Sequence, residues 1–227
     1  MNNSKIRLNK FLAERLGVSR READDLITAG KIKINDEVAQ LGARVDNSSK
    51  VWYNGKIVPF ETDFLYLAFH KPVGYVCSRR AQGSTPTLYE LLPKKYHHLK
   101  TVGRLDKDSS GLILLTNDGN FAYQMTHPKF RKNKVYEVEL DKPLEPLHQQ
   151  MISDYGVMLD DGPSQFKILK LSPQNYYTVI LSEGRNRQIR RTFSALGYQV
   201  TKLHRTGFGP YELDNLKPGE IKIIARL

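Results

Sequence analysis

Apolar residues near the start of the chain recur every three or four positions, which is the spacing of an amphipathic helix. Within residues 7–17 the apolar positions include Leu8, Phe11, Leu12 and Leu16. Ser19 and Glu22 then have the spacing of a capping box at the start of a second helix, over residues 19–30. Each segment finishes on a glycine, which can adopt the left-handed conformation that ends a helix. The pattern predicts two short helices in succession.

After the second helix the pattern changes to alternation of apolar and polar residues. The stretches "KIKIND" (31–36) and "VWYNGKIVP" (51–59) alternate around Asn-Asp and Asn-Gly, which favour tight turns between strands. A small sheet therefore completes this part of the chain, and "PFETDF" (59–64) is typical of a linker. The sequence predicts a small α/β domain over residues 1–60.

From residue 64 the chain consists of many short apolar runs of strand type, separated by turns. The runs are "FLYLAFH", "YVCS", "LILLTN", "KVYEVEL", "FKILKL", "YYTVILS", "QVTKLHR" and "IKIIARL". Helical spacing occurs at "GNFAYQMTHP" (119–128), "LEPLHQQMISDYG" (144–156) and "RNRQIRRTFSALG" (185–197). Because strands and helices do not alternate regularly, we expect an α+β fold with a mixed, largely antiparallel sheet in a second domain, over residues 64–227.

The charge balance narrows the classes of partner. With 35 Lys and Arg against 24 Asp and Glu, the net charge is +11 and the pI is about 9.6, which favours binding to a polyanion. RNA, DNA and an anionic membrane all fit this charge. No run approaches about 18 apolar residues, and the start lacks the apolar stretch of a signal peptide. We therefore expect a cytoplasmic protein that is not exported and that no apolar segment anchors in a membrane.

We expect no metal site and no small-molecule cofactor. Cys77 is the single cysteine, which excludes a cysteine cluster and an internal disulfide and favours a buried, inert thiol. The chain also lacks the Walker sequence GxxxxGK and the dinucleotide fingerprint GxGxxG.

Basic residues flank the second predicted helix. They are Arg20, Arg21, Lys31 and Lys33. Exposed amides at a helix N-terminus add their own affinity for phosphate, although a solvated basic surface is the alternative interpretation. The stretch "RLNKFLAERLGVSRREADDLITAGKIKIND" resembles the S-four-like RNA-binding domain, named for a small-subunit ribosomal protein. The resemblance implies that these four side chains contact RNA.

A second basic segment is "EGRNRQIRRTFSALG" (183–197). On a helix, Ile189 and Phe193 share one buried stripe. This segment and the strand after it carry six cations against the single acid Glu183: Arg185, Arg187, Arg190, Arg191, Lys202 and Arg205. Such a concentration repels itself unless an anion or a buried carboxylate lies nearby. A core helix with solvated arginines is the alternative.

Asp106 is a candidate for that carboxylate. It lies in "GRLDKDSSG", between a predicted strand end and the apolar run that starts at Leu112. An aspartate in such a place often caps its own turn. The polar residues from Asp108 to Gly111 already supply turn chemistry, so Asp106 is available for another role.

Three stretches together resemble the pseudouridine synthases of the RsuA/RluB/RluE/RluF family. They are "GRLDKDSSGLILLTNDG", "KVYEVEL" and "SEGRNRQIRRTFSALGYQV", and with the N-terminal domain the resemblance spans nearly the entire chain. It implies an isomerase that converts a specific uridine of ribosomal RNA to pseudouridine without a cofactor. The form "EGRNRQIRR" favours RNA of the large subunit.

The resemblance also implies roles for individual residues. Asp106 corresponds to the catalytic aspartate, Tyr136 to a tyrosine that stacks on the target uracil, and Arg190 to a basic residue that pairs with the aspartate. Arg104 helps to hold the surroundings of the flipped nucleotide, and Ile189 packs beneath the base. The remaining residues assigned to substrate binding are Arg185, Arg187, Arg20, Arg21, Lys31 and Lys33. Arg187 departs from the family pattern, because several relatives have histidine there.

Several alternatives stay open from sequence alone. A non-catalytic RNA-binding protein of ribosome assembly would explain the charge and the first domain equally well. A glycoside hydrolase would need a second carboxylate opposite Asp106, for which Asp108 is a candidate by composition. Asp106 itself can act as a nucleophile at the sugar or as a base that forms a glycal. We expect a monomer whose partner is ribosomal RNA or a pre-ribosomal particle.

Overall fold

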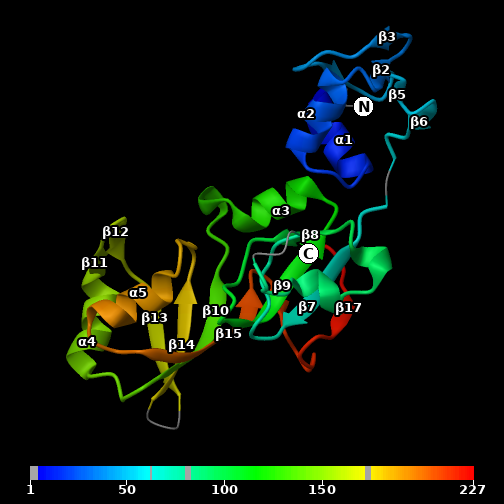
Figure 1. The fold of residues 1–227 in the computed structure, drawn as a ribbon. Coiled ribbons are helices and arrows are strands. Elements are labelled where there is room, and N and C mark those ends of the chain that lie inside the picture. Colours follow the sequence, from blue (N-terminus) through cyan, green and yellow to red (C-terminus); the bar gives the residue numbers. More distant parts are fainter. Residues whose placement is uncertain (1–4, 62, 80–82, 172–174) are drawn as a thin grey trace. The chain divides into compact units, whose positions relative to one another are not determined.

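The chain folds into two compact units in the computed structural model (Figure 1). The described residues are 5–61, 63–79, 83–171 and 175–227. The first unit is Met1–Leu65 with Asn117–Gly119, and the second is Tyr66–Thr116 with Asn120–Leu227. Among the described residues, none of the helices combines the length and apolar character needed to span a bilayer.

The first unit places two helices against a small sheet. Its elements are β1 (Ile6–Arg7), α1 (Leu8–Arg15), α2 (Arg20–Thr28), β2 (Ile32–Ile34), β3 (Glu37–Val38), β4 (Arg44–Val45), β5 (Val51–Tyr53) and β6 (Lys56–Val58). The sheet has the order β3-β2-β5-β6, and β1 pairs with β4. Phe11 of α1, Ala23 of α2 and Val51 of β5 are fully buried in one shared core.

The start of α2 confirms the predicted capping box. The Glu22 amide donates to Ser19 Oγ at 3.1 Å, and the Ser19 amide donates to Glu22 Oε2 at 2.7 Å. Two backbone donors that the helix cannot pair are satisfied in this way. The local sequence alone therefore fixes where this helix begins.

The second unit is built on one twisted sheet with the order β13-β14-β10-β15-β9-β7-β17. Its strands are β7 (Tyr66–Lys71), β8 (Lys100–Val102), β9 (Ser110–Thr116), β10 (Lys134–Leu140), β13 (Lys167–Leu171), β14 (Tyr176–Leu181), β15 (Val200–Phe208), β16 (Tyr211–Glu212) and β17 (Ile221–Ile223). Every described pair of these strands is antiparallel except β9 with β15, which is parallel. The predicted α+β fold with a mixed, largely antiparallel sheet is confirmed.

Short helices and one hairpin complete this unit. They are η1 (Leu88–Leu91), η2 (Lys94–Tyr96), α3 (Gly119–Thr126), η3 (Pro128–Phe130), α4 (Pro146–Gln150), the π-helical turn η4 (Met151–Tyr155), α5 (Gln188–Ala195), and the hairpin of β11 (Val157–Leu159) with β12 (Gly162–Ser164). The helix predicted over 144–156 is thus divided into α4 and η4. The predicted strand "YVCS" is a loop with one isolated bridge, between Val76 and Thr87.

The helix predicted over 185–197 is wrong at its start. α5 begins only at Gln188, because Arg187 has a φ of 46° and lies in the left-handed region. Helical spacing cannot reveal this, since the apolar residues that define it come after Arg187. Arg185 and Arg187 therefore belong to the loop before α5, and their side chains do not follow the spacing of a helix face.

Gly111 permits the close parallel contact between β9 and β15. It pairs with Arg205 and has a φ of +108°. A Cβ at this position would overlap the carbonyl oxygen of Arg205 and lie 2.6 Å from its backbone nitrogen. Both atoms belong to the main chain of a central strand and cannot move aside. A side chain is therefore excluded at residue 111.

Replacing Gly111 by Ala should destabilise the second unit by about 3 kcal/mol beyond the cost of the left-handed backbone, because the strands must separate. Gly197→Ala is the matched control. Gly197 also has a positive φ, +79°, but nothing lies within 4 Å of its absent Cβ, so only about 1–2 kcal/mol of backbone strain is expected. Urea denaturation followed by circular dichroism measures both. Equal losses for the two variants would contradict the steric argument.

Candidate active site

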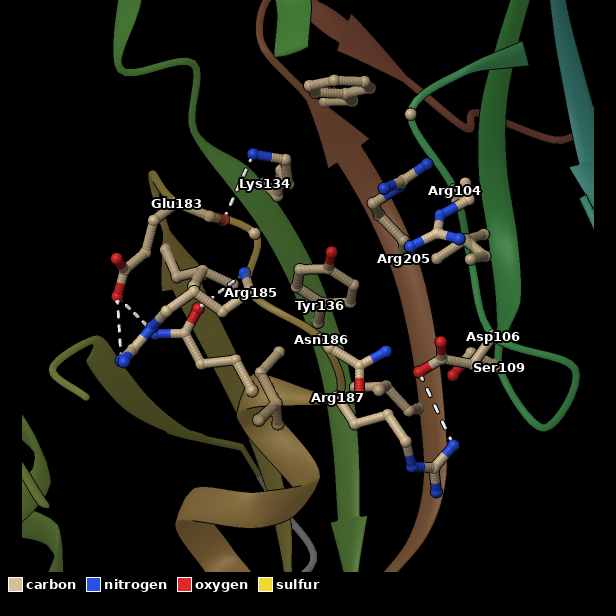
Figure 2. Close-up of a pocket in the computed structure, with 18 of the residues that line it drawn as sticks. Arg104, Asp106, Ser109, Lys134, Tyr136, Glu183, Arg185, Asn186, Arg187 and Arg205 are labelled. Carbon is tan, nitrogen blue, oxygen red and sulfur yellow. Dashed lines mark hydrogen bonds and ion pairs between the residues drawn. The ribbon is translucent and has the colours of Figure 1, made fainter. Parts of the chain in front are cut away.

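A pocket of about 390 Å³ opens at the middle of the sheet, where β10 and β15 face two loops (Figure 2). One loop is the turn 103–109, which leads into β9. The other is the segment 182–187, which leads into α5. The volume lies in the range that small-molecule sites occupy. Segments far apart in the sequence therefore meet at one cavity.

The turn that carries Asp106 is held from beneath by a buried cation. Lys71, at the end of β7, is fully buried, and its ammonium donates to the carbonyls of Pro72 at 3.0 Å, Asp106 at 3.0 Å and Ser109 at 2.6 Å. Burial lowers the pKa of Lys71. The three carbonyls oppose this effect, since they solvate the charged form in place of water. Sequence analysis missed Lys71; the available signal was a lysine placed directly before proline at a strand end.

The carboxylate of Asp106 is not used to build its own turn. The Ser109 amide donates to the backbone carbonyl of Asp106 at 3.1 Å, and Lys71 holds the same carbonyl. Within the described part of the chain, the carboxylate forms one ion pair, with Arg187, in which Oδ2 lies 3.7 Å from Nη1. The side chain of Asp106 keeps about a third of its surface exposed, 35%. Figure 2 shows it at the edge of the pocket, facing Arg187.

The ion pair predicted between Arg190 and Asp106 is not the one that forms. Nε of Arg190 lies 3.3 Å from Asp108 Oδ2, and its other nitrogens donate at 2.8 Å to the carbonyls of Asp108 and Val200. Burial lowers the pKa of Arg190, which the charge of Asp108 opposes. The first turn of α5 directs this side chain to the far end of the turn that holds Asp106. Arg187 is the cation that pairs with Asp106.

Asp108 is a structural carboxylate. It receives two hydrogen bonds from Arg187, at 3.0 and 2.9 Å, besides the contact with Arg190. The hydrogen bond from Arg187 is the main cause of the lowered pKa of Asp108. A glycoside hydrolase needs one carboxyl group that stays protonated as an acid. The pKa of Asp108 is lowered instead of raised, which argues against that class of enzyme.

Tyr136, Ile189 and Arg104 all line the pocket. Tyr136 lies on β10, directly opposite Arg205 of β15, and its side chain is largely buried. Ile189 is buried in the first turn of α5. Arg104 is exposed and makes no hydrogen bond or ion pair within the described residues. The structure thus brings an aromatic face, an apolar floor and an uncommitted cation to the cavity that holds Asp106.

Arg185 lines the pocket but its guanidinium is engaged elsewhere. Nη1 donates to the Asp161 carboxylate and to the carbonyls of Asp161 and Gly162 at 3.0–3.1 Å, and Nη2 donates to the carbonyl of Pro163 at 2.8 Å. Arg191 adds two hydrogen bonds to the same carboxylate, at 3.0 and 2.8 Å. The hairpin of β11 and β12 therefore clamps the loop 182–187, and Arg185 has a structural role there.

Lys134 and Arg205 bring two further cations to the pocket. Lys134 Nζ lies 5.3 Å from the ring centre of Phe208, and the guanidinium carbon of Arg205 lies 4.9 Å from the same centre. Burial, with the neighbouring charge of Arg205, lowers the pKa of Lys134 to about 8. Nη2 of the buried Arg205 makes no hydrogen bond within the described part of the chain. Sequence analysis did not single out Lys134, although its position two residues before Tyr136 places both on one strand face.

The basic residues assigned to RNA in the first unit are exposed at the two ends of α2. Arg20 and Arg21 form its first turn, and Lys31 and Lys33 lie after it, beside Trp52 in a shallow hollow. The capping box places the carboxylate of Glu22 at the helix N-terminus. That carboxylate and the occupied amides weaken the expected phosphate site at this helix end. The exposed side chains are what this unit offers to a polyanion.

Among residues 5–61, 63–79, 83–171 and 175–227, no three His, Cys, Asp or Glu side chains are grouped closely enough to hold a metal ion. The thiol of Cys77 is half-buried and accepts a hydrogen bond from the Leu105 amide at 3.3 Å. Burial raises the pKa of this thiol, which keeps it protonated and inert at neutral pH.

Comparisons with known proteins identify the family of the chain. Residues 65–195 match the family model of RNA pseudouridylate synthases, and residues 6–51 match that of the S4 domain. The chain is 36% identical to the ribosomal small subunit pseudouridine synthase A of Pasteurella multocida, covering 97% of this chain and 96% of that protein.

Two further relatives extend the comparison. The ribosomal large subunit pseudouridine synthase B of Bacillus subtilis is 34% identical, with 95% of this chain and 91% of that protein covered. A crystal structure of a pseudouridylate synthase superposes with a TM-score of 0.70 and 31% identity, over 97% of this chain and 96% of the other. The predicted resemblance is confirmed: the chain belongs to the RNA pseudouridylate synthase family and carries an S4 domain.

Proposed function

We propose that this protein converts uridine to pseudouridine in ribosomal RNA, with Asp106 as the catalytic carboxylate. The observation that carries the proposal is that Asp106 lies at the pocket with its carboxylate unused by the turn, while Lys71 fixes the backbone of that turn. The relatives named above act on small-subunit and on large-subunit RNA. A large-subunit uridine is our inference for this chain, from the form "EGRNRQIRR".

The reaction breaks the bond between the sugar and N1 of uracil, turns the base and joins the sugar to C5, which then loses its proton. Atoms and electrons balance without a redox partner or a metal ion. A carboxylate can attack the sugar carbon, or it can remove a sugar proton to form a glycal. Arg187 supplies a positive charge beside the ionised carboxylate in either mechanism.

The target nucleotide must leave its helix to reach this pocket. Extrusion costs about a few kcal/mol, and stacking of a base on an aromatic ring returns roughly 1–3 kcal/mol. Tyr136 offers that ring and Ile189 an apolar floor. Lys134 and Arg205 lie in the same cavity without a carboxylate of their own, which suits a phosphate of the extruded nucleotide. Arg104 is exposed where it lines the pocket, so it is available to occupy the space that the extruded nucleotide leaves in the RNA.

The partner and the location of the protein can be inferred from the proposed reaction. We infer a cytoplasmic monomer that acts on ribosomal RNA or a pre-ribosomal particle, with neither cofactor nor metal ion. The S4 domain would add affinity through Arg20, Arg21, Lys31 and Lys33, all of which are exposed. A non-catalytic assembly protein is the competing function. It gives no reason for an unused carboxylate facing a cavity lined by cations.

Replacing Asp106 by Asn should abolish pseudouridine formation and leave RNA affinity nearly unchanged. An amide can neither form the ester nor accept the proton, whereas most affinity comes from phosphate contacts elsewhere. Pseudouridines are mapped in both ribosomal RNAs from cells that lack the gene and carry either version, and binding is measured with the purified proteins. Asp214→Asn is the control, since it removes an exposed carboxylate whose one ion pair among the described residues is with Lys222. Normal modification by Asp106→Asn would favour the assembly protein.

Lys134 should make RNA binding sensitive to pH. Its pKa of about 8 means that the ammonium loses its proton between pH 7 and 9, so the KM for RNA should rise by about tenfold as the phosphate contact is lost. Lys134→Arg should flatten this rise, because arginine stays charged, and Lys134→Gln should show the high KM already at pH 7. Initial rates with one RNA at constant ionic strength give the three profiles. A profile unaltered by Lys134→Arg would assign the titration to another group.

Neutralising Arg20 and Arg21 together, as the Gln variants, should reduce the dependence of RNA binding on salt. Each lost phosphate contact lowers the slope of log Kd against log salt by about 0.7–0.9. Filter binding between low and moderate salt gives the slope. Lys94→Gln with Lys95→Gln is the control, as it removes the same charge from exposed residues of the second unit. If both pairs changed the slope equally, the effect would come from net charge alone.

A further inference from the structure

An exposed group of aromatic rings lies at the end of α3. Tyr123 and Phe130 are 46% and 36% exposed, and His127 is exposed between them. The ring centre of Tyr123 lies 4.7 Å from that of His127 and 5.7 Å from that of Phe130. The Lys129 amide donates to His127 Nδ1 at 3.3 Å, which fixes the histidine ring. We call these three residues the ring cluster.

The ring cluster is not part of the hydrophobic core. The core face of α3 is formed by Phe121 and Met125, which are 2% and 4% exposed. Tyr123 is exposed on another side of this helix, and the exposed His127 follows directly after its end. The rings therefore contribute little to the core, and a group of neighbouring exposed rings is a candidate binding surface.

The surroundings of the ring cluster are strongly basic. From residue 119 to residue 136 the sequence has no Asp or Glu, whereas Lys129, Arg131 and Lys132 follow one another closely. The ammonium of Lys129 lies 5.2 Å from the ring centre of Tyr123 and 4.7 Å from that of Phe130. Aromatic faces among cations, on a segment without acidic residues, match the surfaces that bind unpaired nucleic acid.

The ring cluster also borders the catalytic pocket. Thr126 and Pro128, which alternate with its members along the chain, are among the residues that line the cavity. Thr126 reaches the turn of Asp106 as well, since its Cγ2 would lie 3.5 Å from a Cβ on Gly103. A strand of RNA whose nucleotide enters the pocket must pass over the residues at its mouth.

We propose that the ring cluster is a stacking platform for an unpaired base of the substrate RNA, next to the nucleotide that enters the pocket. The proposal rests on the proposed function in taking RNA as the substrate. An RNA occupant is favoured over a protein or a membrane because the surface combines ring faces with cations that form no ion pair within the described residues. The platform holds the RNA once the target base has been extruded, and it takes no part in the chemistry.

The double variant Tyr123→Ala with Phe130→Ala tests this proposal. With transcripts of both ribosomal RNAs, we expect the KM to rise by about tenfold or more and kcat to change little, because binding alone is lost. Tyr123→Phe keeps the ring and should behave as the wild type. Tyr155→Ala is the matched control, since Tyr155 is an aromatic residue 76% exposed in η4. Equal KM values for the double variant and the wild type would overturn the proposal.

A binding assay separates stacking from charge and does not depend on catalysis. We compare a ten-nucleotide oligoadenylate with an abasic oligomer of the same length and charge. The wild type should prefer the oligomer with bases, and the double variant should lose that preference. Loss of affinity for both oligomers alike would mean that the variant had removed phosphate contacts, and the stacking proposal would fail. Preference for bases in a protein without turnover would retain the platform and reject the proposed function.

Photocrosslinking of the wild-type protein covers the case in which the double variant does not fold. Ribosomal RNA transcripts with 5-iodouridine in place of uridine are irradiated on the protein, and the crosslinked peptides are identified by mass spectrometry. We expect crosslinks at Tyr123 or Phe130. Crosslinks confined to other peptides would overturn the proposal.

Discussion

The ammonium of Lys71 is the interaction on which the catalytic half of the molecule depends. It is fully buried and solvated by three carbonyls, two of them in the turn that carries Asp106. A lysine is expensive to bury, and three acceptors left without their donor would each cost about 1–3 kcal/mol. The backbone of the turn is thereby fixed without any use of the Asp106 carboxylate. Gly111, a few residues later, lets the same segment enter the sheet in close contact with β15.

The many arginines around the pocket divide into structural and uncommitted groups. Asp108 engages Arg187 and Arg190, and Asp161 engages Arg185 and Arg191, so two carboxylates organise four cations. These pairs join the loop before α5 to the turn of Asp106 on one side and to the hairpin of β11 and β12 on the other. Part of the positive charge in the sequence therefore serves to hold the loops around the pocket together. These ion pairs hold four of the arginines in place and thereby decide which other cations face the cavity.

Features governed by local interactions could be predicted from the sequence. The start of α2 follows from a capping box of four residues, and the alternating strands follow from period-two burial. Asp106 stood out because its neighbours already supplied the turn. The partner of Arg190 could not be predicted, because it depends on the positive φ of Arg187 and on where the β8 to β9 turn lies in space. The burial of Lys71 could not be predicted for a related reason. A lysine at a strand end is usually solvated, and here long-range packing buries it.

Two cations of the pocket have backbone partners but no carboxylate partner among the described residues: Lys134 donates to the carbonyl of Glu183 at 3.2 Å, and Arg205 donates to the carbonyl of Leu112 at 2.7 Å. Both side chains lie near the ring of Phe208, and Nη2 of Arg205 makes no hydrogen bond within the described part of the chain. Burial and the neighbouring charge of Arg205 hold the pKa of Lys134 near 8, so the two positive charges repel each other in the pocket. In the function proposed above, a phosphate of the substrate would relieve this repulsion and supply acceptors at the same time. Such a contact would concentrate binding energy close to Asp106, where the proposed reaction needs the extruded nucleotide to be held, and a ligand without a phosphate would gain little from entering.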